Sequence, residues 1–266
     1  MSHRDLFFHE SILEMLATLS KVFREQKVDF FLIGAIARDI RLSASAEYKP
    51  RRMTKDVDIA IWVGSEHEFQ RVKQALIETG DFTAHDKWAI RLFYKHAIDL
   101  DLLPFGGIEG ADREVRIEKP QLFLIDMPGF AEVMPEAEVL KVGNTELRIC
   151  SLEGLVLLKL FANANNSTRT KDITDIEDIL QLYFDLETEK IFTVHPDVPD
   201  LYSTADPDYM ALVSARITGR VMGNILKEAP DLQNRLLHIL NSKTPNRYWP
   251  EIAAGLAEAA SKGVAL

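Results

Sequence analysis

The chain has 266 residues, of which 47% are hydrophobic and 27% charged, a balance typical of a globular protein with a sizeable core. Its 31 basic and 41 acidic residues give a formal net charge of −10, which argues against a protein that coats nucleic acid through general basic charge. The apolar runs are too short to span a bilayer, and the single cysteine, Cys150, excludes an intramolecular disulfide and fits a reducing compartment. We therefore expect a cytoplasmic protein without a membrane segment.

The first half of the sequence predicts alternating helices and strands. Apolar residues at helical spacing predict an amphipathic helix over residues 6–26, and Gly34 with Ala35 begins a turn into a second helix. A third helix is expected over residues 66–79, ending at Gly80. Pro104 is expected to break the strand that precedes it. The expected strands lie at residues 30–33, 57–63, 89–94, 97–103, 114–117, 122–125, 137–142 and 147–149.

From Ser151, a favoured N-cap residue, the pattern becomes helical. The prolines between residues 192 and 207 predict a loop within this half. The expected helices lie at residues 152–164, 173–184, 209–226, 232–240 and 250–260. We therefore expect an α/β (α+β) fold, with a short mixed β-sheet flanked by helices over residues 1–150 and an all-α domain over residues 151–266.

Two pairs of aspartates stand out. Asp56 and Asp58 are two residues apart in one expected strand, so their side chains project from the same face. Two adjacent negative charges are costly unless a cation lies between them. Asp101 from a later strand is expected to complete the site, while Asp99 is either a further ligand or lies at its rim. The pattern predicts a Mg²⁺ (or Mn²⁺) site in which Asp56, Asp58 and Asp101 bind metal and serve catalysis.

The turn before these strands is suited to phosphate. Gly34 and Ala35 have small side chains, so backbone N–H groups at the start of the helix are open to an anion. Basic residues are concentrated between the turn and the first aspartate pair, and they are either a solvated loop or anion contacts. Their place beside the expected phosphate site favours contact. They are Arg38, Arg41, Lys49, Arg51, Arg52 and Lys55.

Together these residues resemble the DNA polymerase β-type nucleotidyltransferase superfamily, in which a strand–turn–helix glycine motif precedes Asp-x-Asp and a third Asp. Within it, the chain is most similar to the AbiEii/MenT-like nucleotidyltransferases, many of them toxins of bacterial toxin–antitoxin pairs. One position departs from the pattern, because Ala35 stands where much of the superfamily has Gly or Ser, and it lacks a hydroxyl for the phosphate. The resemblance spans roughly residues 28–184 and rests on residues 34–39, 54–58, 101–106, 159 and 169–172.

The resemblance implies transfer of a nucleoside monophosphate from an NTP to a hydroxyl acceptor, either a tRNA 3′ end or a protein, with release of pyrophosphate. It also implies a toxin of a type IV toxin–antitoxin pair, with a cognate antitoxin as partner. The chemistry of the helical half leaves Lys159 open to a second interpretation, as a lysine that reaches water from an apolar helix. Asp175 and Asp178 are ordinary partners of a helix dipole. The implied nucleotide-binding residues are Gly34, Ala35, Arg38, Lys55, Lys159, Lys171 and Asp172.

Three alternatives remain open on the sequence. In the first, the acceptor is a small molecule such as an aminoglycoside. In the second, the enzyme maintains the CCA end of tRNA. Residues 34–39 also resemble the opening motif of CCA-adding enzymes, although the chain has no convincing counterpart of their later nucleobase-selecting motifs. From another class, the protein is an NTP-binding regulator without turnover. The complete set of carboxylates argues against this third alternative.

Overall fold

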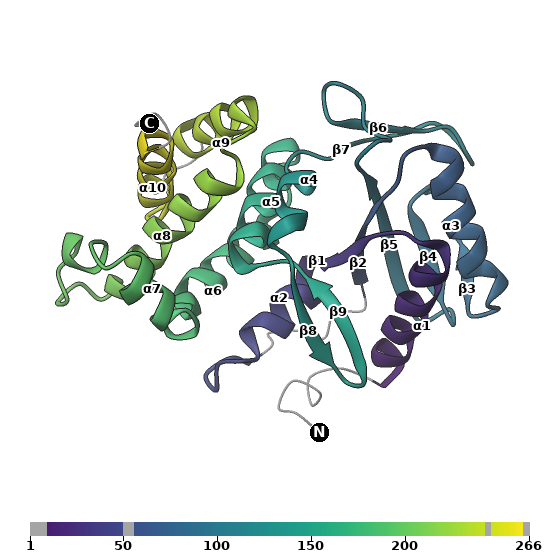
Figure 1. Ribbon diagram of the computed structural model, residues 1–266, viewed down its shortest axis with the longest axis horizontal. Helices are drawn as coiled ribbons and strands as arrows, with labels where there is room; N and C mark the ends of the chain where they lie inside the picture. Colours follow the sequence, from purple (N-terminus) through teal and green to yellow (C-terminus); the bar gives the residue numbers. More distant parts are fainter. Residues whose placement is uncertain (1–9, 50–55, 243–245, 263–266) are drawn as a thin grey trace. The chain divides into compact units, whose positions relative to one another are not determined.

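A computed structural model describes residues 10–49, 56–242 and 246–262 (Figure 1). The described residues separate into two compact units. The first joins those up to Ala44 with those of Lys49–Cys150, and the second joins Ser45–Tyr48 with those from Ser151 onward. The first unit is mixed α/β and the second is helical, so the predicted fold class is confirmed. Within these ranges, no helix is both long and apolar enough to cross a bilayer.

A mixed sheet forms the core of the first unit, with seven strands among the described residues in the order β3-β4-β5-β2-β1-β9-β8. Strand β2 is central, since it runs antiparallel to β1 on one side and parallel to β5 on the other. A separate two-stranded sheet consists of β6 (Glu114–Ile117) and β7 (Phe123–Asp126). The strands of the large sheet are β1 (Phe30–Ile33), β2 (Asp56–Trp62), β3 (Phe82–Ala84), β4 (Arg91–Tyr94), β5 (Ile98–Phe105), β8 (Glu138–Val142) and β9 (Thr145–Ile149).

Helices accompany the large sheet. The α1 and α3 helices contact each other (Figure 1). Helix α1 buries an apolar stripe that includes Met15, Leu19 and Phe23. The N-cap of α3 is Ser65, whose hydroxyl accepts the Glu68 N–H at 3.2 Å. The helical segments of this unit are α1 (Glu10–Gln26), α2 (Gly34–Leu42), α3 (Glu66–Glu78), α4 (Phe130–Val133) and the short 3₁₀ segment η2 (Met134–Glu136).

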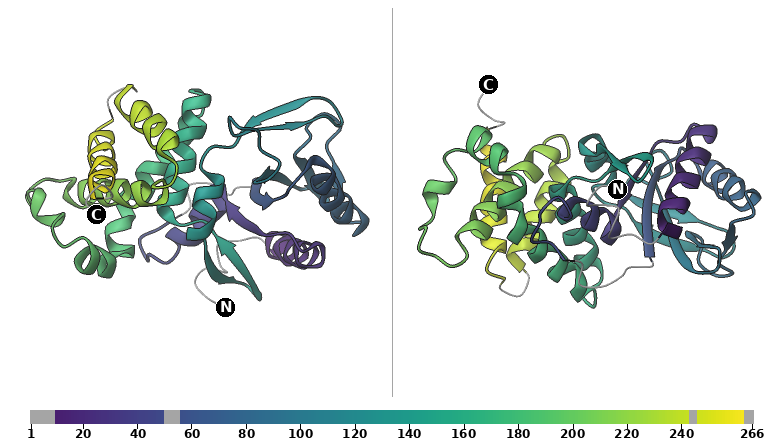
Figure 2. Two further views of the ribbon diagram at one scale, coloured as in Figure 1. Left: turned by 45° about the horizontal axis from the view of Figure 1, so that its top comes forward. Right: turned by 90° about the horizontal axis from the view of Figure 1, so that it is seen from below.

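The second unit is built from helices around a close pair, α8 and α10. The yellow α10 lies against the green α8 in both views of Figure 2. Glycines allow this approach, because a Cβ on Gly219 would lie 2.2 Å from the Ile252 carbonyl oxygen and one on Gly255 would lie 2.0 Å from that of Arg216. The helical segments are α5 (Leu152–Asn165), α6 (Thr170–Leu186), α7 (Thr188–Val194), η3 (Pro199–Leu201), α8 (Tyr209–Ile225), α9 (Pro230–Ser242) and α10 (Trp249–Lys262). The predicted N-cap is confirmed, since the Ser151 hydroxyl accepts the Gly154 N–H at 3.1 Å.

The structure corrects one strand end. Pro104 was expected to break its strand, but it lies inside β5 and pairs with Ile61 of β2. Two residues earlier, Leu102 donates its N–H to Ile90, on the β4 side of the strand. The nitrogen of Pro104 faces the same side, beyond the point where β4 pairs with β5. The missing N–H therefore costs no hydrogen bond of the sheet.

Short elements also differ from the prediction. Strand β3 and helix α4 were not expected, because three or four residues are too few to display a period. Part of the expected loop over residues 192–207 is helical, since α7 extends to Val194 and η3 covers Pro199–Leu201. Pro196 lies between these short helices, Pro199 is the first residue of η3 and Pro207 follows them, so none of the three interrupts a helical hydrogen bond.

Candidate functional site

Four carboxylates lie on one face of the central strands. In the parallel pairing of β2 with β5, Asp56 is in register with Asp99 and Asp58 with Asp101. The alternate residues of both strands are fully buried in the core, which places the aspartates on the opposite face. These core residues are Val57, Ile59, Leu100 and Leu102.

Asp58 lies directly against the start of α2. It is paired with Ile33, the last residue of β1, and Gly34 follows with a φ of +69°. A Cβ on Gly34 would lie 2.0 Å from the Asp58 Oδ2. Glycine is therefore required twice at this turn, for its backbone conformation and for the close carboxylate. Ala35 follows in the first turn of α2, whose N-cap residue offers no side-chain hydrogen bond.

Two arginines after this turn contact protein groups. Arg38 is buried and pairs with Asp39, at 2.9 Å from Nε and 2.6 Å from Nη2 to the Asp39 Oδ1. Arg41 donates to the carbonyl oxygens of Ile149 and Cys150 at 2.9 and 3.0 Å, which ties α2 to the end of β9. Lys55, with its basic neighbours at positions 51 and 52, lies outside the described residues.

A residue that the sequence analysis missed, Arg91, contacts the carboxylate face. Its Nε and Nη2 donate to the two oxygens of Asp101 at 2.7 and 2.6 Å, and its Nη1 donates to Asp99 at 3.3 Å. Arg91 is paired directly with Asp101 in the antiparallel β4–β5 ladder, so both side chains project from the same face. The hairpin itself was the available signal, because folding it about residues 95–97 brings positions 91 and 101 opposite each other.

The charges around Arg91 reinforce this contact. The hydrogen bond to Asp101 raises the pKa of the Arg91 guanidinium, and the negative charges of Asp101, Asp99 and Asp56 raise it further, while burial opposes them. Asp56 thus acts electrostatically on the same cation as the β5 aspartates. Asp56, Asp99 and Asp101 therefore act together on the Arg91 guanidinium.

The chemistry of the donors fits a divalent cation. Four carboxylates from paired strands provide the hard oxygen ligands that Mg²⁺ and Mn²⁺ prefer. Among the residues that the structure describes, no three His, Cys, Asp or Glu side chains are arranged to hold a metal ion. Both oxygens of Asp101 bond to Arg91 instead. Asp56 and Asp58 lie on the same face of β2, with Asp58 beside the Gly34 turn, and their role in holding a cation stays a prediction.

The predicted residues of the helical half form a cluster within the second unit. Lys159 of α5 is buried, and its Nζ donates to Asp175 at 2.7 Å and to Asp172 at 3.2 Å. Arg169 also donates to Asp172, at 2.6 Å. Lys171 is exposed at the start of α6. Lys159 thus extends to buried carboxylates, whereas Lys171 is open to solvent.

Replacing Lys159 with methionine should lower the free energy of unfolding by about 3 kcal/mol, because it removes a buried cation that bonds to two buried carboxylates. The matched change Lys171→Met removes an exposed lysine and should cost less than about 0.5 kcal/mol. Urea unfolding of both variants measures the difference. Equal stabilities would contradict a structural role for the Lys159 cluster.

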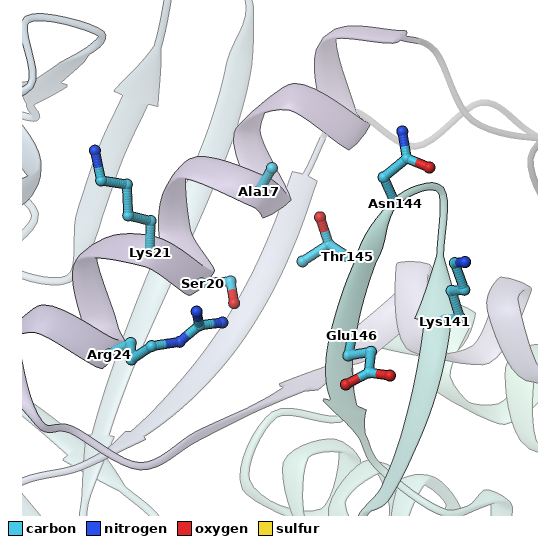
Figure 3. A pocket seen from close by; sticks show the side chains of 8 residues that line it. All are labelled: Ala17, Ser20, Lys21, Arg24, Lys141, Asn144, Thr145 and Glu146. Atoms are coloured by element: carbon cyan, nitrogen blue, oxygen red, sulfur yellow. The ribbon is translucent and has the colours of Figure 1, made fainter.

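A separate groove lies between α1 and the β8–β9 hairpin of the first unit (Figure 3). It has a volume of about 420 Å³ and contains none of the predicted site residues. Cationic side chains dominate its charged lining. The lining residues are Ala17, Ser20, Lys21, Arg24, Lys141, Asn144, Thr145 and Glu146.

No family model and no curated protein matches the chain. Among solved structures, the antibiotic-resistance factor ANT(2'')-Ia is 14% identical with a TM-score of 0.46, over 73% of this chain and 95% of that one. An antigenic nucleotidyltransferase-like protein from Paracoccidioides brasiliensis is 14% identical with a TM-score of 0.38, over 84% and 90%. The Thermotoga maritima CCA-adding enzyme complexed with tRNA is 15% identical with a TM-score of 0.28, over 92% and 66%. At these levels of similarity, the neighbours do not assign a function to this chain.

Proposed function

We propose that the chain is a nucleotidyltransferase of the polymerase β type, which transfers a nucleoside monophosphate from an NTP to a hydroxyl acceptor. The observation that carries this proposal is the placement of Asp58 over the Gly34 turn, with Asp101 in register on the neighbouring strand. A helix start with a glycine turn beside paired carboxylates is a combination suited to phosphoryl transfer. Few structural roles require a carboxylate against a glycine that no other residue can replace.

The reaction assigns a task to each part of the cluster. The acceptor oxygen attacks the α-phosphorus, a new phosphodiester bond forms, and the bond to the β-phosphate breaks to release pyrophosphate. Asp56 and Asp58 hold the divalent cation, which supplies charge neutralisation for the triphosphate when bound. Gly34 and Ala35 present backbone N–H groups to the phosphates. Asp101, once separated from Arg91, draws the proton of the acceptor hydroxyl.

The acceptor we propose is a tRNA 3′ end or a protein, with a toxin role and a cognate antitoxin as the accompanying biology. The net charge of −10 disfavours an acceptor held by general basic charge, so an RNA would have to dock locally. A small hydroxyl compound is the alternative acceptor. The roles of Arg38, Lys55, Lys159, Lys171 and Asp172 in nucleotide binding stay predictions from the resemblance.

An assay of labelled-NTP transfer tests the proposed function. Each of the four NTPs, labelled at the α-phosphate, is incubated with Mg²⁺ or Mn²⁺ and separately with total tRNA, cell protein or small hydroxyl compounds. We expect label on one acceptor class with the wild-type chain and none with Asp56→Asn, since the variant loses a metal-binding charge. Binding of NTP without transfer to any class would indicate the regulator instead.

A further inference from the structure

Arg91 occupies both oxygens of the aspartate that the proposed reaction needs. The two hydrogen bonds to Asp101 measure 2.7 and 2.6 Å and form a two-point fork, the strongest arrangement between arginine and a carboxylate. The Asp101 side chain is 19% exposed and that of Arg91 is 20% exposed, so water screens the pair only in part. A third bond, to Asp99, extends the contact along β5.

An aromatic support holds the guanidinium in this place. The Arg91 Cζ lies 4.6 Å from the centre of the Trp88 ring, a cation–π contact. Trp88 in turn stacks on His85, with ring centres 5.4 Å apart and planes inclined by 25°. The His85 Nδ1 accepts the N–H groups of Lys87 and Trp88, which fixes the loop before β4. The stacked Trp88 and His85 rings therefore position the Arg91 guanidinium.

A carboxylate whose two oxygens are both bonded to a guanidinium has little capacity left for a metal ion. In the same register, Asp58 and Asp56 lie one strand away on the same face. We propose that Arg91 is an internal counter-cation that competes with the divalent cation for Asp101. Metal binding and the Arg91–Asp101 fork exclude each other, so Arg91 sets the metal concentration at which the three-carboxylate site assembles. The inference rests on the proposed function for its purpose, but the competition is measured without any nucleotide.

Removal of Arg91 should strengthen metal binding. By titration of Mn²⁺ followed by electron paramagnetic resonance, the full-length Arg91→Met variant should bind the ion about tenfold more tightly than wild type. Arg91→Lys keeps the charge but loses the fork, so its affinity should lie between the two. Arg116→Met removes an exposed arginine of the same unit and should leave the affinity unchanged. Thermal unfolding shows that each variant is folded at the temperature of the titration.

Tryptophan fluorescence gives a second readout that a purely structural role would not change. When Mg²⁺ releases Arg91 from the aspartates, the environment of Trp88 alters, so wild type should show a saturable fluorescence change. The change should vanish in Trp88→Phe and in Arg91→Met. These variants separate Trp88 from the other tryptophans, Trp62 and Trp249.

The outcomes separate this inference from the proposed function. Weaker or unchanged Mn²⁺ binding by Arg91→Met would overturn the competition, even if wild type transfers nucleotide. Identical binding by wild type and Arg91→Lys would also overturn it, since net charge alone would then explain the effect of methionine. Tighter binding by Arg91→Met supports the competition whether or not the transfer assay finds an acceptor.

Discussion

Replacing Asp58 with asparagine should lower nucleotidyl transfer by about a thousandfold or more. Asparagine has nearly the shape of aspartate, so it fits the space over Gly34, but it lacks the negative charge that holds a divalent cation. The measurement is the single-turnover rate of labelled-NTP transfer to the acceptor class found in the assay. The free energy of unfolding of the variant, measured by thermal unfolding, should stay within about 1 kcal/mol of the wild-type value, because the change alters charge more than packing.

The matched control is Asp81→Asn, which removes an acid immediately before β3, a strand that β4 separates from β5. Its transfer rate should equal that of wild type. If Asp58→Asn retained wild-type transfer in Mg²⁺, the assignment of Asp58 to the metal site would fail. If both variants lost activity together, a general charge effect would replace the specific one.

Gly34→Ala should abolish transfer and destabilise the first unit by about 3 kcal/mol or more. Two costs add here. An alanine at a φ of +69° is strained by about 1–2 kcal/mol, and its Cβ would lie 2.0 Å from the Asp58 Oδ2, so the carboxylate must leave its position. Urea unfolding measures the loss of stability, and the single-turnover rate measures the loss of transfer.

A second glycine, Gly80, separates the cost of the close carboxylate from the cost of the backbone conformation. Gly80 has a φ of +83°, but a Cβ there would meet nothing within 4 Å. Gly80→Ala should therefore show only the backbone cost of about 1–2 kcal/mol, with transfer unchanged. The double change Gly34→Ala with Asp58→Ala should recover part of the stability lost by Gly34→Ala alone, since the crowded carboxylate is gone. Equal effects of the two single glycine changes would remove the argument for a close carboxylate.

Local patterns in the sequence predict much of what surrounds the site. The strand over Phe30–Ile33 has the predicted bounds, and the expected strand over residues 57–63 differs from β2 by one residue at each end. These elements are identified by short-range signals, namely apolar runs, turn residues and the two-residue period of a strand. The same period places Asp56 and Asp58 on one face, because neighbours within a strand need no knowledge of the rest of the fold.

Tertiary structure decided the partners of these residues. Whether a carboxylate meets a cation, a glycine or water depends on strand order and register, which join residues distant in sequence. Arg91 reaches Asp101 through the β4–β5 ladder, and Asp58 meets Gly34 through the β1–β2 ladder. Lys159 is a similar case, since apolar neighbours along its helix do not reveal the buried acids of α6 that it contacts.

The sequence by itself therefore determined the class of fold, the position of the glycine turn and the pairing of aspartates along each strand. Only the tertiary structure decided that Asp101 is bonded to an arginine and that Asp58 lies against a glycine. The physical reason is the range of the interactions. Periodicity and turn chemistry act within a few residues, whereas ion pairs and close backbone approaches are set by the packing of segments far apart in the chain.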